Sequence, residues 1–194
     1  MSKAVRAMAA TARNRVRIIG GIWRSRVITF PARAGLRPTP DRVRETLFNW
    51  LGQNLTGRRC LDLFAGSGAL GFEAASRGAA QVVMVDRDRE VCSALEKSAR
   101  ALNATQVTIA CEDALGFLAR DRRHFDVIFL DPPYASNAFV KILPLVPRHL
   151  SEEGVLYVES SAAHLLSDDW QVLREQRAGQ VRFLIARCAV PAGL

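Results

Sequence analysis

The chain has 194 residues, of which 49% are hydrophobic and 24% charged, the composition of one ordinary globular domain with room for a short extension. No apolar run approaches the roughly 18 residues of a membrane-spanning helix, which excludes an integral membrane protein of that kind. The net charge of +8 is uneven: residues 1–44 hold eleven Lys or Arg and one acid, whereas the remainder holds sixteen bases and eighteen acids, so the N-terminal part is expected to meet a polyanion such as nucleic acid.

Residues 1–14 are rich in Arg and Ala without the apolar core of a secretory signal, and we expect a disordered basic arm there. Two β-branched runs, 16–19 and 26–30, flank Gly20-Gly21 and predict a β-hairpin. With its Pro- and Gly-rich connector it forms a region, 15–40, that we interpret as a docking element for nucleic acid. The side chains expected to contact it are Arg15, Arg17, Trp23, Arg24, Arg26, Arg37, Arg42 and Arg44. A solvated tail that only aids solubility is the alternative.

An amphipathic helix over 41–54 opens the main domain, 41–194. Short apolar runs then alternate with helical segments, which is typical of a parallel sheet with helices on both faces. We expect strands at 60–64, 81–85, 107–110, 125–130 and 154–159, helices at 69–77, 87–102, 113–120 and 138–150 (the last interrupted), and a terminal antiparallel pair at 170–175 and 180–188. The fold class is therefore α/β with a seven-stranded, mostly parallel sheet, and ligands of such sheets bind at the carboxyl ends of the strands.

The segment Gly66-Ser-Gly68-Ala-Leu-Gly71 is a GxGxxG motif between a strand and a helix, with Asp86 twenty residues beyond its first glycine. This pattern indicates a nucleoside ligand whose ribose hydroxyls the distal acid binds. Asp62, four residues before the motif, suits the cationic amino group of S-adenosylmethionine (SAM) better than the pyrophosphate of NAD. A carboxylate that only braces the loop is the alternative for Asp62. The acidic pair Glu112-Asp113 offers an acceptor for the adenine amino group.

The segment Asp131-Pro-Pro-Tyr134 follows a buried strand and predicts a device that positions an amine. A nucleobase amine is a poor nucleophile, and acceptors on its N–H groups favour pyramidal geometry that aims the lone pair at a methyl group. The Asp131 carboxylate and the Pro132 carbonyl supply such acceptors, Pro133 stiffens the turn, and Tyr134 offers a ring for stacking. The target base must leave its stack, so we expect a single-stranded, looped or flipped substrate. A Pro-Pro loop end with a core tyrosine is the alternative.

Several motifs together resemble the RsmD-type bacterial 16S ribosomal RNA guanine-N2 methyltransferases. They are Arg17-Ile-Ile-Gly-Gly-x-Trp-Arg24, Gly35-Leu-Arg-Pro-Thr39, Asp41-Arg-Val-Arg-Glu-Thr-Leu-Phe-Asn-Trp-Leu51, Asp62-x-Phe-Ala-Gly-Ser-Gly-Ala-Leu-Gly71 and Asp131-Pro-Pro-Tyr134. The likeness runs from about Arg15 to Arg187, and the block from Arg17 to Leu51 is its specific part.

The resemblance implies a Rossmann-like class I SAM-dependent methyltransferase fold and methyl transfer to one guanine amine in 16S ribosomal RNA. It implies a cytoplasmic monomer that acts on the small subunit or a late assembly intermediate. By the same resemblance, SAM is held by Asp62, Phe64, Ala65, Gly66, Ser67, Gly68, Asp86 and Asp113, and the guanine by the segment Asp131 to Tyr134. Thr39, Arg42 and Arg44 are expected near the site.

Three other functions remain open on the residues alone. A DNA adenine or cytosine amino-methyltransferase would use the same Asp-Pro-Pro-Tyr chemistry. An NAD-dependent oxidoreductase would use the glycine motif and Asp86, and a non-catalytic RNA-binding module would need neither. The four cysteines and three histidines are scattered without ligand spacing, so we expect reduced thiols and no metal.

Overall fold

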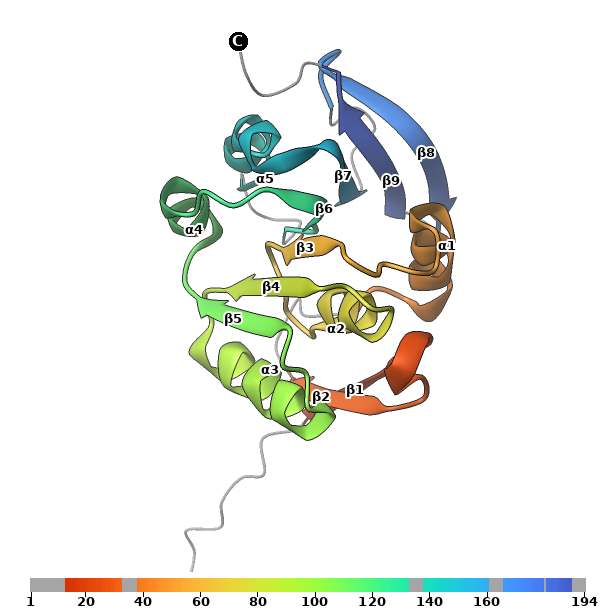
Figure 1. Cartoon of the computed structure of the whole chain (residues 1–194), viewed down its shortest axis with the longest axis vertical. Helices are drawn as coiled ribbons and strands as arrows, with labels where there is room; N and C mark the ends of the chain where they lie inside the picture. Colours follow the sequence, from red (N-terminus) through yellow and green to blue (C-terminus); the bar gives the residue numbers. More distant parts are fainter. Residues whose placement is uncertain (1–12, 33–37, 133–137, 161–165, 180, 190–194) are drawn as a thin grey trace, which may run out of the picture.

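The computed structural model describes residues 13–32, 38–132, 138–160, 166–179 and 181–189. Its main element is a seven-stranded sheet in the order β5-β4-β3-β6-β7-β9-β8 (Figure 1). The strands from β3 to β7 pair in parallel, and β9 pairs antiparallel with both β7 and β8. Their bounds are β3 Arg59–Asp62, β4 Gln81–Asp86, β5 Val107–Cys111, β6 Phe125–Leu130, β7 Leu150–Ser160, β8 Trp170–Ala178 and β9 Val181–Cys188. The predicted α/β fold with a mostly parallel sheet is confirmed.

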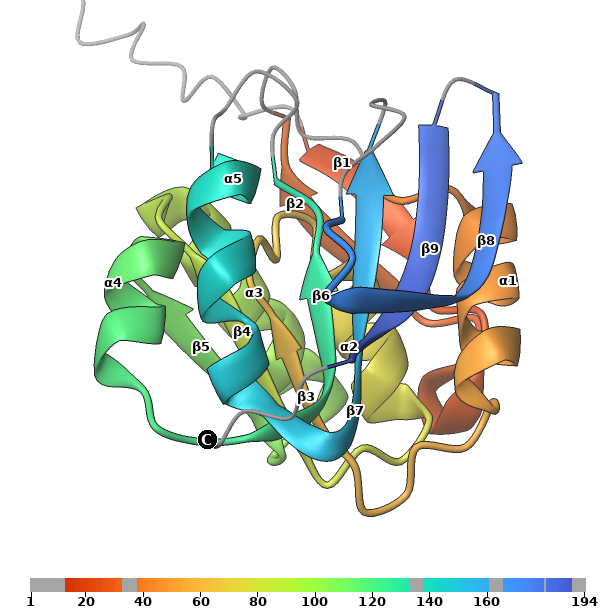
Figure 2. The ribbon, with the colours of Figure 1, turned by 90° about the horizontal axis from the view of Figure 1, so that it is seen from above.

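Helices cover both faces of this sheet (Figure 2). They are α1 (Asp41–Leu51), α2 (Ala69–Ser76), α3 (Arg89–Leu102), α4 (Ala114–Arg120) and α5 (Ala138–Ile142). One core cluster joins α1, α2 and α3 to residues such as Met84 and Phe129, and a second joins α4 and α5 to Val85 and Ile128. Because side chains alternate along a strand, the central strands β3, β4 and β6 are buried on both faces between the two helical layers, which explains their continuous apolar runs.

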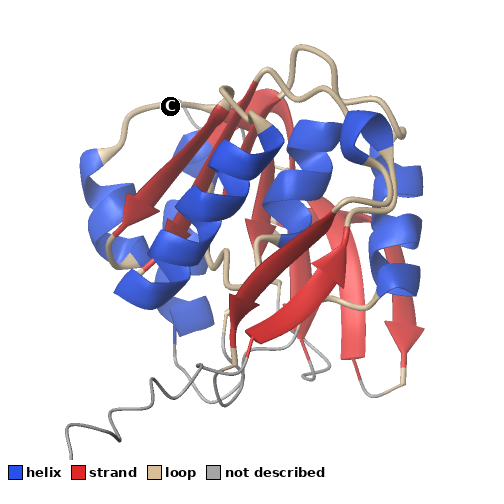
Figure 3. Ribbon diagram, turned by 90° about the horizontal axis from the view of Figure 1, so that it is seen from below, coloured by secondary structure: helices blue, strands red, loops and turns tan. Residues whose placement is uncertain are grey.

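The predicted hairpin is present as β1 (Arg13–Arg17) and β2 (Val27–Pro31), which pair antiparallel. A 3-10 turn, Gly21–Trp23, joins them. The hairpin lies against α3 and α2 rather than apart from the domain (Figure 3). Its inner side chains belong to the core cluster of α1, α2 and α3: Val16, Ile18, Ile28 and Phe30 are each no more than 6% exposed. The hairpin is therefore built into the domain.

The expected helix over 138–150 is replaced by α5 and two 3-10 turns, Leu143–Leu145 and Pro147–His149. Pro144 and Pro147 explain the break, since proline lacks the N–H that continues an α-helix. Other predicted bounds differ from the observed ones mainly at the ends of elements, the largest shift being the earlier start of β7. In the described ranges, no helix is long and apolar enough to span a bilayer.

Candidate active site

The glycine motif forms the turn between β3 and α2. Gly66 and Gly68 have φ of +48° and +76°, a region that glycine adopts without strain. Gly71 lies in the first turn of α2, where a Cβ atom would stand 2.4 Å from Cε of Met84 in β4. The glycines thus allow a tight turn and a close approach of helix to sheet, as the dinucleotide fingerprint requires.

Asp62 is the last residue of β3 and is only 3% exposed. Its Oδ2 accepts a hydrogen bond from the Gly71 N–H at 3.2 Å, so the carboxylate does brace the start of α2. Burial raises the pKa of Asp62 from 3.8 to about 7, against the opposing effect of its backbone donors. A buried carboxylate with a strongly raised pKa, and no ion pair among the described residues, is a feature of ligand sites.

Asp86 ends β4, the next strand in the sheet. Its Oδ2 accepts from the Gly66 N–H at 3.0 Å and its Oδ1 from the Asp88 N–H at 2.9 Å. Burial raises the pKa of this carboxyl as well. Asp86 therefore ties the glycine loop to β4 and brings a second acidic group to the same edge of the sheet.

Asp113 follows β5 and is the N-cap of α4. Its Oδ1 accepts from the N–H groups of Leu115 and Gly116 at 2.9 and 3.4 Å. The side chain is exposed at the edge where β3 and β4 end. The other predicted cofactor residues, Phe64, Ala65 and Ser67, lie in the turn after β3, and Ser67 Oγ accepts from the Ala69 N–H at 3.3 Å.

Asp131 and Pro132 directly follow β6, which pairs with β3 on one side and β7 on the other. Asp131 is half-buried and Pro132 is buried. Burial raises the pKa of Asp131 well above its ordinary value, and the nearby carboxyls of Glu159 and Asp62 raise it further. The predicted site residues Pro133 and Tyr134 lie outside the described residues.

Glu159, near the end of β7, was not anticipated from the sequence. It is 6% exposed and its Oε1 accepts from the Tyr157 hydroxyl at 2.7 Å. The buried Thr39 hydroxyl donates to the same carboxyl, whose pKa burial raises. The available signal was an acid at the end of the strand predicted at 154–159.

The outer side of the hairpin is basic. Arg15, Arg17, Arg24 and Arg26 are exposed, as is Arg42 at the start of α1. Arg26 reaches the end of α3, where its Nη2 donates to the carbonyl of Ala101 at 3.2 Å. Arg37 lies outside the described part of the chain.

The structure corrects two of the predicted RNA contacts. Trp23 is 8% exposed, and its backbone N–H donates to Ser76 Oγ at 2.9 Å. Arg44 is 0% exposed and lies within an ion-pair cluster. Neither side chain presents a surface to RNA, so these two assignments are wrong.

The ion-pair cluster consists of Arg44, Glu73 and Arg77, with Asp41 at its rim. Glu73, in α2, is fully buried and pairs with Arg44 at 3.3 Å and Arg77 at 2.8 Å. Glu73 also accepts the backbone N–H of Ile19 at 2.9 Å. Buried charges must be paired and fully hydrogen-bonded to be tolerated, so the cluster ties the hairpin to α1 and α2.

Arg44 extends the ion-pair cluster toward the site. Its Nη2 donates to the carbonyl of Arg17 at 2.9 Å and its Nε to the carbonyl of Thr39 at 3.1 Å. Because the Thr39 hydroxyl bonds Glu159, one chain of hydrogen bonds runs from β1 to the carboxyl near the end of β7.

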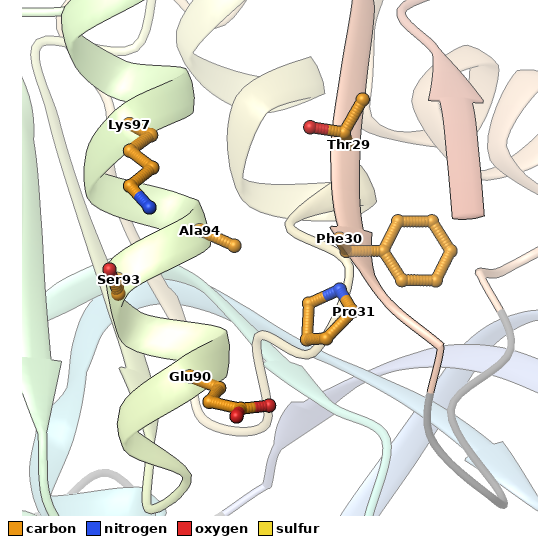
Figure 4. Close-up of a pocket in the computed structure, with 7 residues that line it drawn as sticks. All are labelled: Thr29, Phe30, Pro31, Glu90, Ser93, Ala94 and Lys97. Atoms are coloured by element: carbon orange, nitrogen blue, oxygen red, sulfur yellow. The ribbon is translucent and has the colours of Figure 1, made fainter. Parts of the chain in front are cut away.

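A groove of about 210 Å³ separates the hairpin from α3 (Figure 4). Thr29, Phe30, Pro31, Glu90, Ser93, Ala94 and Lys97 line it. Lys97 adds a positive charge to those of the hairpin. Among the described residues, no cluster of three or more His, Cys, Asp or Glu side chains could hold a metal ion.

Comparison with known proteins gives consistent matches over most of the chain. Residues 16–187 match the family described as Conserved hypothetical protein 95. Ribosomal RNA small subunit methyltransferase D of Escherichia coli strain K12 is 42% identical over 173 residues, 87% of each chain. The Haemophilus influenzae protein of the same name is 39% identical over 180 residues, 89% of this chain and 93% of that relative. The structure of the putative methyltransferase yhhF from Escherichia coli superposes with a TM-score of 0.82 at 40% identity, covering 90% of this chain and 98% of the other.

Proposed function

The chain belongs to the Conserved hypothetical protein 95 family, together with relatives named ribosomal RNA small subunit methyltransferase D, and on that basis we propose that it methylates the N2 amine of one guanine in 16S ribosomal RNA. It is a SAM-dependent ribosomal RNA methyltransferase, which sets aside the NAD-dependent oxidoreductase. The observation that carries the finer proposal is the position of Asp131 and Pro132 at the end of β6, beside Asp62 at the end of β3.

The acidic edge of the sheet fits the polar groups of SAM. Asp62 would accept from the methionine ammonium, Asp86 from the ribose hydroxyls and Asp113 from the adenine amino group. The Gly66–Gly68 turn leaves room for the close approach of the ligand. When bound, SAM supplies an electrophilic methyl group on its sulfonium.

On the substrate side, the chain positions the nucleophile. The Asp131 carboxylate and the Pro132 carbonyl would accept hydrogen bonds from the guanine N2 amine, with Tyr134 stacked on the base after the turn that Pro133 stiffens. This arrangement orients the nitrogen lone pair and stabilises the positive charge that develops on the amine. Catalysis then comes mainly from orientation and electrostatic preorganisation.

The basic hairpin would hold the RNA. Arg15, Arg17, Arg24, Arg26 and Arg42 are exposed and would contact phosphates, which position a nucleic acid without reading its sequence. We expect the protein to act as a monomer in the cytoplasm, on the small subunit or a late assembly intermediate.

The test is methylation of purified small subunits that lack the modification. Purified protein and labelled SAM should yield N2-methylguanosine at one position, located by mass mapping, whereas double-stranded DNA should not be labelled. A label on an adenine or cytosine amine would refute the proposal.

The docking role has its own comparison. Arg15→Ala combined with Arg24→Ala should raise KM for subunits and flatten the dependence of binding on salt, since fewer counterions are released. Arg122→Ala is the matched control, because this exposed arginine precedes β6 at the opposite edge of the sheet. An equal effect of both changes would contradict docking by the hairpin.

A further inference from the structure

Four carboxyls stand in a row along the carboxyl edge of the sheet. The strand order places them as Asp86 on β4, Asp62 on β3, Asp131 after β6 and Glu159 on β7. In the proposed function, the first two hold SAM and the third holds the target amine. Glu159 therefore lies one strand beyond the amine, on the side away from the cofactor, where the rest of the base must extend.

Glu159 shares a face of the sheet with Asp131. Phe129 and Tyr157 are register partners and both belong to the core cluster under α1 and α2. Since side chains alternate along strands, Asp131 and Glu159, each two residues further on, return to that face. The effect of the Glu159 carboxyl on the pKa of Asp131 agrees with their proximity.

The two carboxyls form an acceptor pair that needs donors. Among the described residues Glu159 has no ion pair, and its donors are two neutral hydroxyls, those of Tyr157 and Thr39. These hydroxyls fix its orientation and leave further lone pairs on a carboxylate that can accept about four hydrogen bonds. Two neighbouring acidic groups on one face at the carboxyl edge of the sheet suit a ligand edge that carries adjacent N–H donors.

Guanine has such an edge, with the N2 amine next to the N1–H. Adenine instead presents an N1 lone pair, which a carboxylate repels. We propose that Glu159 accepts the N1–H of the target guanine while Asp131 accepts from its N2 amine, so that Glu159 is a specificity-determining residue. This inference rests on the proposed function.

The test uses small subunits reconstituted with 16S ribosomal RNA that carries guanine or 2-aminopurine at the mapped target. 2-Aminopurine keeps the N2 amine but has a lone pair at N1. Glu159→Gln should lower kcat/KM for guanine by about ten- to hundred-fold, as expected for loss of a charged hydrogen bond. Because the Gln amide donates to N1 of 2-aminopurine, the preference for guanine should narrow or reverse, while the Kd for SAM stays within about two-fold.

The matched control is Glu152→Gln, the same change on an exposed side chain of β7, and it should keep the wild-type preference. Equal losses on both bases in Glu159→Gln would overturn the inference and leave Glu159 a structural role. Should that variant fail to fold, the wild-type protein still decides: equal methylation of the two bases would overturn the inference. A methyl group on another base atom would refute the proposed function and this inference together.

Discussion

Asp62 makes the stability of the ligand-free protein depend on pH in a way that can be calculated. Its pKa is 3.8 ordinarily and about 7 in the folded protein. Because the folded value is the higher one, its favourable contribution is complete below about pH 4 and is lost as the pH rises through 7. A shift of about three units corresponds to about 4 kcal/mol, of which about 2–3 kcal/mol falls between pH 5 and pH 8.

Asp62→Asn removes this titration while keeping the shape of the side chain. The melting temperature of the variant relative to wild type should therefore rise by about 5–10 °C between pH 5 and pH 8, on the scale of about 2–4 °C per kcal/mol for a chain of this size. Thermal unfolding at several pH values measures it, with Asp168→Asn, an exposed position, as the control for the substitution.

Bound SAM should reduce the difference in melting temperature between Asp62→Asn and wild type at pH 8, since its ammonium compensates the buried carboxylate. The affinity for SAM should fall as the pH drops below 7, because Asp62 then becomes protonated. A difference between variant and wild type that stays constant from pH 5 to pH 8 would refute the reasoning. Asp62 would then have the pKa of an ordinary carboxyl. The ligand-free protein would carry no energetic cost of a buried negative charge for the SAM ammonium to offset.

Three further changes separate chemistry, cofactor binding and stability. Asp131→Ala should abolish methyl transfer in single-turnover assays while SAM affinity stays within about a few-fold, because in the proposed function this carboxylate acts on the amine; wild-type turnover would remove it from the mechanism. Asp86→Ala should weaken SAM binding by about 1–3 kcal/mol, measured by isothermal titration, and an unchanged Kd would mean that another group binds the ribose. Glu73→Ala should destabilise the protein by about 3–5 kcal/mol in urea unfolding, whereas Glu96→Ala, at an exposed pair with Arg100, should cost less than about 1 kcal/mol; equal losses would contradict the importance of the ion-pair cluster.

The succession of strands and helices along the chain and the position of the chemistry could be predicted because both depend on local signals. The run from Phe125 to Leu130 is bounded by polar residues and prolines, and its predicted limits match β6. The spacing of the glycines in the turn from Gly66 to Gly71 is one that only a few kinds of strand-to-helix turn require. These patterns are complete within about ten residues of sequence.

The roles of Arg44 and Trp23 could not be predicted because their partners are remote. An arginine beside Val43 and Leu47 reads as the polar rim of an amphipathic helix. Its burial becomes evident only when Glu73, 29 residues further on, stands opposite. The proximity of Glu159 to Asp131 could not be predicted for the same reason, since it depends on the pairing of β6 with β7 and not on the surroundings of Glu159 in the chain.

The ion-pair cluster also sets a geometric condition on the substrate. Glu73 and Arg44 hold the backbone of the hairpin, so the hairpin cannot hinge away without taking a hydrogen-bond partner from each of these two buried charged groups. The backbone positions that carry the outer arginines consequently keep a fixed distance from Asp131 at the end of β6. Under the docking role proposed for the hairpin, a folded RNA that places its phosphates on these arginines would present to Asp131 only the nucleotide at that distance. The three-dimensional shape of the RNA would then select the target among many chemically identical guanines.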